Sequence, residues 1–278
     1  TLHICYCLTP TRYVWRYHQY AEQENLGGIL RTIMPPFLTS LRQWDRLAAD
    51  RVDHFIAISQ AIRQRIAKVY RRDSTIIYPP VDTHRFAPLE GSVERKEDYY
   101  LIVGRLVPYR RIDILIEAFN KMGKPLVIAG DGRDRERLEA LAGPTIEFLG
   151  YVPDEDLPDL MARCRTFMWP GEEDFGISPI QAMAAGRPVI AYAAGGALET
   201  VIPGQTGALF YEQTAQAIVE AVEQFDESTL DPQAISAFAA QFDTSEFKRK
   251  MQEFVEEKFE QRKREQQAGP AQKLTADS

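Results

Sequence analysis

The feature that most constrains this chain is a regular alternation, from residue 99 onward, of short apolar runs and helical apolar periods. YYLIVG (99–104) suits one buried strand, and Ile112, Leu115, Ile116 and Phe119 then recur at i, i+3, i+4 and i+7, one face of a helix. Further strands are expected at 125–130, 145–150, 166–170, 188–192 and 207–210, and further helices at 133–141, 154–164 (capped by Asp154), 178–185 and 214–225. Strands joined by helices pair in parallel, which predicts an α/β fold with a doubly wound, Rossmann-like sheet. Ligands bind such sheets beyond the carboxyl ends of the strands.

The first 80 residues resemble part of a second unit of the same kind. Strands are expected at 3–7, 54–59 and 75–78, and helices near 40–51 and 59–70. The prediction is therefore a partial N-terminal Rossmann-like domain (1–80), a linker rich in proline and charge (81–98), a second Rossmann-like domain (99–242), and a C-terminal helix and tail (243–278).

Charge and composition disfavour several classes of function. The 278 residues carry a formal net charge of −7, which gives no support for nucleic-acid binding. No apolar run approaches the ~18–20 residues of a membrane span. Three cysteines without a disulfide framework favour a reducing, cytoplasmic compartment, and the four histidines, His18 among them, show no metal-ligand spacing. We therefore expect no metal and no cofactor. The apolar stripe of the C-terminal helix predicts a docking surface; it comprises Phe247, Met251, Phe254, Val255 and Phe259.

The first strand of the second domain is followed by GRLVPYRR (104–111). This segment places Gly104, Arg105 and either Arg110 or Arg111 at the carboxyl edge of the sheet. Two guanidiniums there could form a fork for a diphosphate, because each can bind phosphate oxygens bidentately. A basic surface loop is the alternative interpretation.

The second strand ends in GDG (130–132). Gly130 and Asp131 would form a tight turn that lets a ligand approach the backbone closely. An ordinary strand-to-helix turn fits the pattern as well. AAGGALETV (193–201) offers a further glycine pair at a strand end, again a candidate backbone cradle.

The strand over 166–170 leads into GEEDFGISPIQAMAAGRP (171–188). Ser178 is expected to be the N-cap of the following helix, with Pro179 at its first position. The free N–H groups and the dipole of that helix suit an anion, and Gly176 keeps the backbone accessible. Glu173 would then lie ahead of the anion and accept hydrogen bonds from hydroxyls of a group attached to it. A solvated acidic loop is the alternative.

Several longer stretches together resemble one enzyme family. They are VGRLVPYRRIDILIEAF, IAGDGRDRERLEAL, FLGYVPDEDLPDLMARC, PGEEDFGISPIQAMAAGRPVIAYAAGGALETV and IIYPPVDTHRF. Over roughly residues 55–225 they resemble the retaining family 4 glycosyltransferases of the GT-B fold. HICYCLTPTRYVWRYHQY (3–20) resembles the first loop of a mannosyltransferase-like subgroup that acts in polysaccharide or lipid-linked glycan assembly.

The resemblance implies a nucleotide-sugar donor in the cleft between two Rossmann-like domains. In the family an Arg and a Lys hold the diphosphate; Arg105 matches the first, and Arg110 stands where Lys is usual. The family's E-x7-E motif places Glu173 against the donor-sugar hydroxyls. Its second acid, expected at the ribose, is Gln181 here, which can still accept a hydrogen bond.

The resemblance also assigns backbone contacts. The amides of Phe175, Gly176 and Ile177, next to Ser178, would line the sugar and phosphates. The turn containing Tyr151 and Val152 would face the base.

Two further departures concern the N-terminal side. Leu8 stands where the family often has a His facing the donor sugar. The family's N-terminal domain usually begins with a glycine-rich loop and strands ahead of the position of residue 1, so we expect an incomplete acceptor site.

The leading hypothesis is a glycosyltransferase that moves a sugar, with mannose from GDP-mannose favoured over a UDP-sugar, to a glycan or lipid-linked acceptor with retention. Arg105, Arg110 and the helix N-terminus would stabilise charge on the leaving diphosphate without a metal. Loss of Arg105 should then cost on the order of 10²–10³ in rate. The rivals are an epimerase or phosphorylase of the same fold and a catalytically impaired nucleotide-sugar-binding or scaffold subunit.

One partner hypothesis concerns residues 61–72. This basic amphipathic segment could rest on anionic lipid at the inner membrane face, although a solvated helix face explains it as well. Apolar surface left by an incomplete domain keeps an oligomer open as an alternative.

Overall fold

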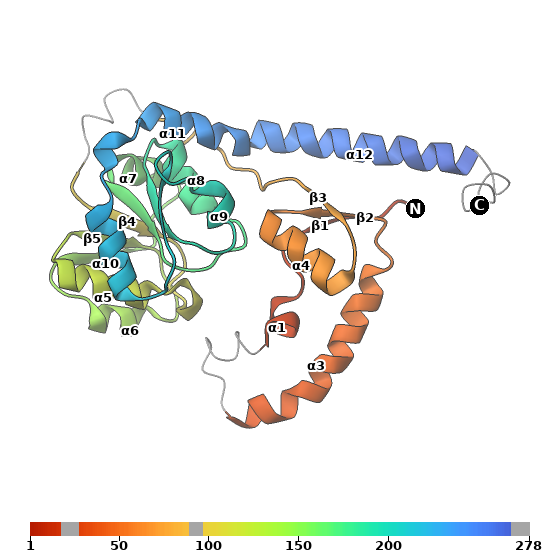
Figure 1. The fold of residues 1–278 in the computed structure, drawn as a ribbon, viewed down its shortest axis with the longest axis horizontal. Coiled ribbons are helices and arrows are strands. Elements are labelled where there is room, and N and C mark those ends of the chain that lie inside the picture. The colour runs from red at the N-terminus through yellow and green to blue at the C-terminus, as the bar shows by residue number, and fades with distance from the viewer. Residues whose placement is uncertain (18–27, 89–96, 268–278) are drawn as a thin grey trace.

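The computed structural model describes residues 1–17, 28–88 and 97–267, with the backbone alone for 28–33. In these ranges the strands form two parallel sheets, one in each of two units (Figure 1). Parts of the expected linker (89–96) and tail (268–278), and His18, lie outside the described residues. The prediction of two Rossmann-like units with parallel sheets is confirmed.

The N-terminal unit has a three-stranded sheet in the order β1-β2-β3. Its strands are β1 (Ile4–Cys7), β2 (His54–Ala57) and β3 (Ser74–Ile76), and its helices are α1 (Arg12–Trp15), α3 (Gly28–Ala49) and α4 (Gln60–Tyr70). The three expected strands are confirmed to within two residues, whereas α3 begins well before the expected residue 40. The tight first turn of α4 has a side-chain cap, because the Ser59 hydroxyl accepts from the Ile62 amide at 3.2 Å.

The C-terminal unit has a six-stranded sheet in the order β6-β5-β4-β7-β8-β9. The strands are β4 (Tyr100–Val103), β5 (Leu126–Ala129), β6 (Ile146–Gly150), β7 (Thr166–Trp169), β8 (Val189–Tyr192) and β9 (Gly207–Phe210). The chain works outward from β4 in one direction and then returns to add β7 on its other side. The strand order therefore reverses between β4 and β7, which is the switch point where doubly wound sheets bind ligands.

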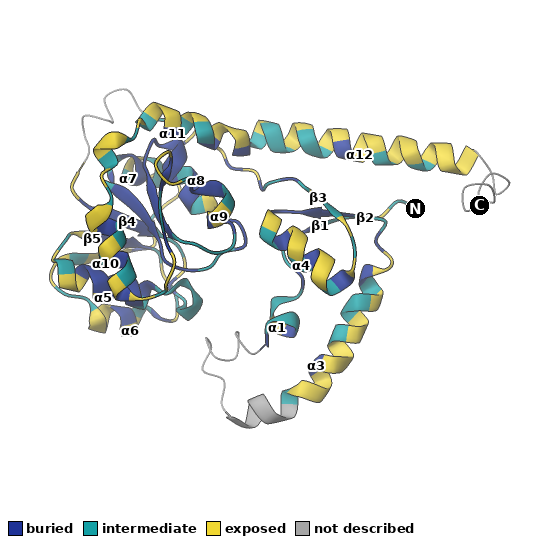
Figure 2. Cartoon of the chain, in the orientation of Figure 1, coloured by how far each residue is buried: buried dark blue, intermediate teal, exposed yellow. Residues whose placement is uncertain are grey.

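Helices cover both faces of this sheet, as the alternating strand pattern requires. They are α5 (Ile112–Met122), α6 (Arg135–Leu141), α7 (Leu157–Arg163), α8 (Ile177–Ala184), α9 (Ala197–Thr200), α10 (Ala215–Gln224) and α11 (Pro232–Ala239). Tyr100 and Ile102 pack with α5 and α10 on one face, while Leu101 packs with α7, α8 and α11 on the other. The central strands β4, β5 and β7 are buried, the edge strand β6 is partly exposed, and the outer helix faces are exposed (Figure 2).

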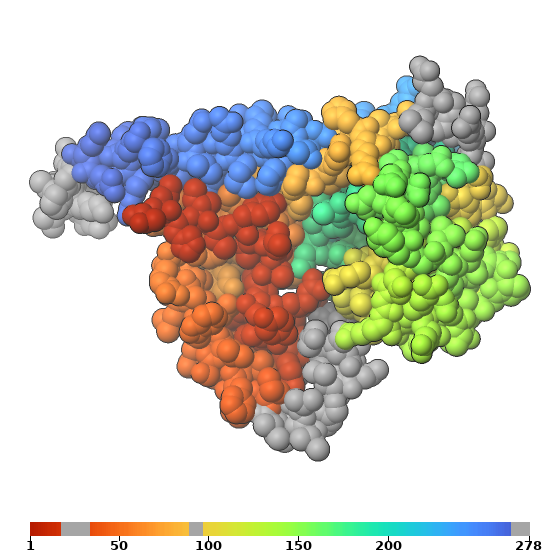
Figure 3. Space-filling view, turned by 180° about the vertical axis from the view of Figure 1, so that it is seen from behind, coloured from red at the N-terminus to blue at the C-terminus, as the bar shows by residue number. Residues whose placement is uncertain are grey.

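The C-terminal helix α12 (Thr244–Gln267) leaves the second unit and runs along the first (Figures 1 and 3). Phe254 is buried against Ile56 and Ile77 of the N-terminal unit, with Phe247 and Met251 packed beside it. The docking surface predicted from the apolar stripe is thus present, but Val255 and Phe259 remain exposed.

The basic segment 61–72 is largely α4, and two of its arginines are used inside the protein. Arg72 donates to the carbonyl oxygens of Val52 and Asp53 at 2.7 and 2.8 Å, and Arg65 forms ion pairs with the other unit. This leaves fewer basic groups for a lipid surface, and the membrane contact stays a prediction. In the described ranges no helix is both long and apolar enough to cross a bilayer.

Asp243 fastens the start of α12 to the segment that crosses between the units. The buried carboxylate accepts from the Thr83 hydroxyl at 2.7 Å, the Thr83 amide at 3.2 Å, and the Ser245 amide and hydroxyl at 2.8 and 2.6 Å. Burial by itself would raise the pKa of Asp243, but these four hydrogen bonds lower it well below its ordinary value.

Asp243→Asn should lower the free energy of unfolding at neutral pH by about 1–3 kcal/mol, because buried donors lose a charged acceptor. Since the folded-state pKa is depressed, the contribution is fully present above the unfolded pKa, about 3.9, and is lost progressively as pH falls from there through the lower folded-state pKa. Urea unfolding between pH 7 and pH 3 should therefore show a constant difference between the two proteins down to about pH 4 and a narrowing difference below it. Asp226→Asn is the control, since Asp226 accepts from Ser228 in the same way but is exposed; an equal loss there would contradict the prediction.

Candidate active site

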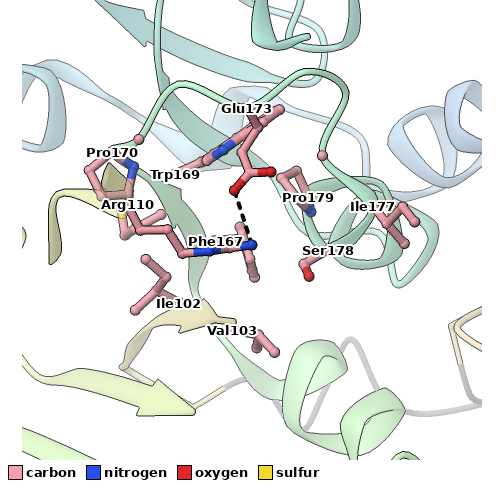
Figure 4. Close-up of a pocket in the computed structure, with 13 residues that line it drawn as sticks. Ile102, Val103, Arg110, Phe167, Trp169, Pro170, Glu173, Ile177, Ser178 and Pro179 are labelled. Atoms are coloured by element: carbon pink, nitrogen blue, oxygen red, sulfur yellow. Dashed lines mark ion pairs between the residues drawn. The ribbon is translucent and has the colours of Figure 1, made fainter. Parts of the chain in front are cut away.

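A pocket opens where β4 and β7 end, at the reversal of strand order (Figure 4). It holds about 360 Å³ of space that is partly open to solvent. Its lining comes from the two strands, the loops that follow them and the start of α8: Ile102, Val103, Arg110, Phe167, Met168, Trp169, Pro170, Gly171, Glu173, Gly176, Ile177, Ser178 and Pro179. The ends of the strands, where the sequence predicts ligand binding, therefore line a cavity.

Two of the predicted residues face each other in this pocket. Arg110 Nη2 lies 3.0 Å from Glu173 Oε1, and the two side chains are only 22% and 20% exposed (Figure 4). Three polar atoms here are buried and have no hydrogen-bond partner among the described residues: Arg110 Nε, Trp169 Nε1 and Glu173 Oε1, which has the ionic contact alone. Buried polar atoms are rarely left unsatisfied, so three of them on residues that line the same pocket favour a polar ligand there.

The N-terminus of α8 forms one wall of the pocket. The helix begins at Ile177, and Gly176 is the N-cap with φ 93° and no side-chain cap hydrogen bond. The prediction that Ser178 is the N-cap was therefore wrong; Ser178 lies in the first turn and lines the pocket. A Cβ on Gly176 would lie 2.3 Å from the Trp169 ring, so only glycine fits there. The uncapped amides and the helix dipole favour an anion.

Three consecutive acids, Glu172, Glu173 and Asp174, follow β7; this acidic triplet has two kinds of partner. Glu173 faces the pocket, whereas Glu172 and Asp174 form ion pairs with Arg12, Arg16 and Arg65 of the N-terminal unit. Of the three acids only Glu173 lines the pocket, and its contact with a ligand stays a prediction.

Arg105 lies outside the pocket lining. It follows β4, is exposed and makes no ion pair within the described part of the chain. The rival basic residue Arg111 pairs with Asp113 at 3.2 Å, so Arg110 is the arginine that this loop directs into the pocket.

Gly104 and Gly130, at the ends of β4 and β5, leave room for close contacts that a side chain would block. A Cβ on Gly130 would lie 2.0 Å from the Gly104 carbonyl oxygen, and one on Gly104 would lie 2.4 Å from Arg110 Nη1. Gly130 therefore lets two strand ends meet, and Gly104 makes room for the Arg110 guanidinium. The exposed Asp131 carboxylate caps the turn by accepting from the Gly132 amide at 2.7 Å.

The remaining predicted residues are placed farther from the pocket. Tyr151 is 75% exposed, and Val152 packs partly against the core. The Phe175 ring is buried and stacks on Tyr78 with centroids 5.6 Å apart, so only its amide is available to a ligand. Gln181 lies one turn after Ile177 on the same face of α8, half-buried and beyond the pocket lining.

Sequence reasoning missed two groups. Trp169 was read only as part of a strand, although a tryptophan followed by Pro-Gly at a strand end is a candidate pocket wall. Tyr109 was also missed; the centroid of its ring lies 5.5 Å from the Arg12 guanidinium carbon and 6.0 Å from that of Arg110. Within the described ranges, no three His, Cys, Asp or Glu side chains are grouped to hold a metal ion.

Comparison with known families agrees with this geometry. The model of the glycosyl transferases group 1 matches residues 89–242, more than half of the chain, and that of glycosyltransferase family 4 matches residues 2–85. The chain belongs to the group 1 glycosyl transferases. The match covers the sheet, the pocket and both Arg110 and Glu173.

Relatives of this glycosyltransferase include named mannosyltransferases. A GDP-mannose-dependent alpha-(1-6)-phosphatidylinositol monomannoside mannosyltransferase of Mycolicibacterium smegmatis is 30% identical over 219 residues, covering 69% of this chain and 56% of that protein. An O-antigen chain mannosyltransferase B of Escherichia coli is 36% identical over 107 residues, 34% of this chain and 28% of that protein. The chain thus spans about half the length, or less, of the curated relatives it matches.

Solved structures share the fold of this glycosyltransferase. Anabaena HepE in complex with UDP-glucose superposes with a TM-score of 0.69 at 23% identity, over 78% of this chain and 67% of that one. Sucrose-phosphate synthase from Thermosynechococcus elongatus gives 0.76 at 24% identity, over 93% and 67%.

Proposed function

We propose that this glycosyltransferase transfers mannose from GDP-mannose, with retention, to a glycan or lipid-linked acceptor. The observation that carries the donor site is the Arg110–Glu173 pair, with its unsatisfied polar atoms, beside the uncapped N-terminus of α8. Together they offer positive charge for a diphosphate and a carboxylate for hydroxyl groups within one pocket. The choice of GDP-mannose rests on the named activities of the mycobacterial relatives.

The residues would divide the work as follows. Arg110 and the α8 amides stabilise the charge that grows on the leaving diphosphate, which is electrostatic catalysis without a metal. Arg105, exposed at the same edge of the sheet, is available to turn toward the phosphates. Glu173 accepts hydrogen bonds from sugar hydroxyls and so orients the reacting face.

The second candidate is a nucleotide-sugar-binding subunit with impaired turnover. Two positions favour it: Leu8, exposed where the family often has His, and Gln181, where the second acid of the motif is usual. This candidate predicts donor binding of ordinary strength with no transfer to any supplied acceptor.

Calorimetric titration with GDP, UDP and ADP, and with their sugar conjugates, tests the proposal. Glu173→Ala should leave nucleoside diphosphate affinity nearly unchanged and weaken GDP-mannose by about tenfold or more, the size of a lost hydrogen bond to a charged group. Glu136→Ala on α6 removes an exposed carboxylate away from the pocket and should change neither. Preference for UDP over GDP would reject GDP-mannose as the donor, and no binding of any nucleotide would reject the donor site.

A further inference from the structure

The two acids that flank Glu173 tie its loop to the N-terminal unit. Arg16 donates to both carboxylate oxygens of Glu172 at 2.8 and 2.9 Å, and Arg12 donates to Asp174 at 2.7 Å. Both arginines belong to α1 or directly follow it. The loop after β7 is therefore held by the N-terminal unit as well as by its own unit.

Arg65 is the residue that joins the two ties. Its Nη2 donates to Glu172 at 2.9 Å and its Nη1 donates to Asp174, so one guanidinium bridges carboxylates on either side of Glu173. The Arg65 and Asp174 side chains are only 20% and 11% exposed, and salt screens such contacts less than surface pairs. The rigid fork of Arg suits two acceptors, which a Lys ammonium matches less well.

The charges around Asp174 favour its ionised form. Burial alone would raise the pKa of Asp174, but the charges of Arg65 and Arg12 and their hydrogen bonds lower it below its ordinary value. The bridge is therefore intact at neutral pH.

The backbone of Glu173 is held from its own unit. Its carbonyl oxygen accepts from the Gly196 amide at 2.9 Å, and Gly195 lies directly beside it. Glu172 and Asp174 face the N-terminal unit through their ion pairs, whereas Glu173 faces Arg110 in the pocket. Fixing both neighbours fixes the direction of the central carboxylate.

We propose that Arg65 is a positioning residue of the donor site: by bridging Glu172 and Asp174 it directs Glu173 toward Arg110, and so couples the contact between the two units to the site. This inference rests on the proposed function of Glu173. Arg65 itself does not line the pocket.

The helix that carries Arg65 has a second anchor, which makes the inference testable. Glu199 of α9 accepts from the Gln60 amide at 2.9 and 3.1 Å at the start of α4, and from the Tyr78 hydroxyl at 3.1 Å. We therefore expect α4 to stay docked when Arg65 is replaced.

The first test needs no ligand. Amide hydrogen exchange over residues 171–177 should become at least tenfold faster in Arg65→Ala than in the wild-type chain, with an intermediate rate in Arg65→Lys. Arg63→Ala removes an exposed arginine from the same helix and should leave the rate unchanged. If residues 171–177 of Arg65→Ala exchanged at the wild-type rate, the proposal would be overturned, whatever the melting temperature of the variant.

The second test uses GDP and GDP-mannose. The ratio of their affinities should shift about tenfold against the sugar conjugate in Arg65→Ala, and by nothing further when Arg65→Ala is added to Glu173→Ala. An additive effect of the two changes would show that Arg65 acts independently of Glu173, which also overturns the proposal. If the wild-type chain binds neither compound, the proposed donor fails, while the exchange rate still decides whether Arg65 holds the loop.

Discussion

Replacing Arg110 with alanine is expected to lower the transfer rate by on the order of 10²–10³, the usual cost of removing one preorganised charge stabiliser. Arg110 is the arginine of the loop after β4 that lines the pocket, and its removal also strips Glu173 of its ionic partner at 3.0 Å. The measurement is the steady-state rate with GDP-mannose and an acceptor glycan. Where no acceptor is in hand, GDP affinity by calorimetry should fall in the same variant.

Two variants of the same loop serve as controls for Arg110. Arg110→Lys keeps the charge, and should retain most of the activity because the family usually has Lys at this position. Arg111→Ala removes the same charge from the neighbouring residue. The Arg111 side chain pairs with Asp113 and does not line the pocket, so the transfer rate and the GDP affinity should change little. If Arg111→Ala lowered the rate as much as Arg110→Ala, the net charge of the loop would support donor binding, rather than a specific contact of Arg110.

The architecture was predictable because hydrophobic periodicity is a local signal that determines which segments form helices or strands and which face of each is buried. The apolar residues at 112, 115, 116 and 119 are all buried in α5, and each expected strand of the C-terminal sheet is present. Helix starts were less predictable. Asp154 was expected to cap α7, but this helix begins at Leu157, after Asp156, without a side-chain cap hydrogen bond. Candidate cap residues are common in loops, and a distant contact decides which conformation is adopted.

Gly176 shows how such a contact acts at the candidate site. The Trp169 ring, from the preceding strand, occupies the space where a side chain would be, so a glycine with positive φ precedes α8 and Ser178 moves into the first turn. The local pattern Ser-Pro favours a different start, and no residue next to it in sequence reveals the tryptophan.

The acidic triplet shows that the partners of charged residues are also hard to predict from sequence. The prediction that an acid lies at the ligand-binding edge follows from its place after a strand, and Glu173 does line the pocket there. That Glu172 and Asp174 face the other unit depends on Arg12, Arg16 and Arg65, which lie more than a hundred residues earlier in the chain. Ion pairs between units have no periodic signature, so sequence alone could not divide the triplet.

Gly195→Ala should be among the most destabilising single changes near the site. Gly195 has φ 59°, and an added Cβ would lie 2.0 Å from the Glu173 carbonyl oxygen. A left-handed conformation costs an alanine about 1–2 kcal/mol, and the overlap with fixed backbone should add about 1–3 kcal/mol as in other overpacked sites. Thermal and urea unfolding measure the total, and GDP-mannose affinity should fall because the Glu173 peptide must shift.

Gly204→Ala separates the two contributions. Gly204 has φ 75°, and nothing lies within 4 Å of its added Cβ, so this variant carries the cost of the conformation alone. The stability difference between the two variants then measures how firmly the Glu173 backbone is held. Equal unfolding free energies, with equal GDP-mannose affinity, would mean that the loop yields freely. A larger loss of unfolding free energy in Gly195→Ala would show that the Glu173 backbone is held rigidly, as a carboxylate that orients a sugar requires.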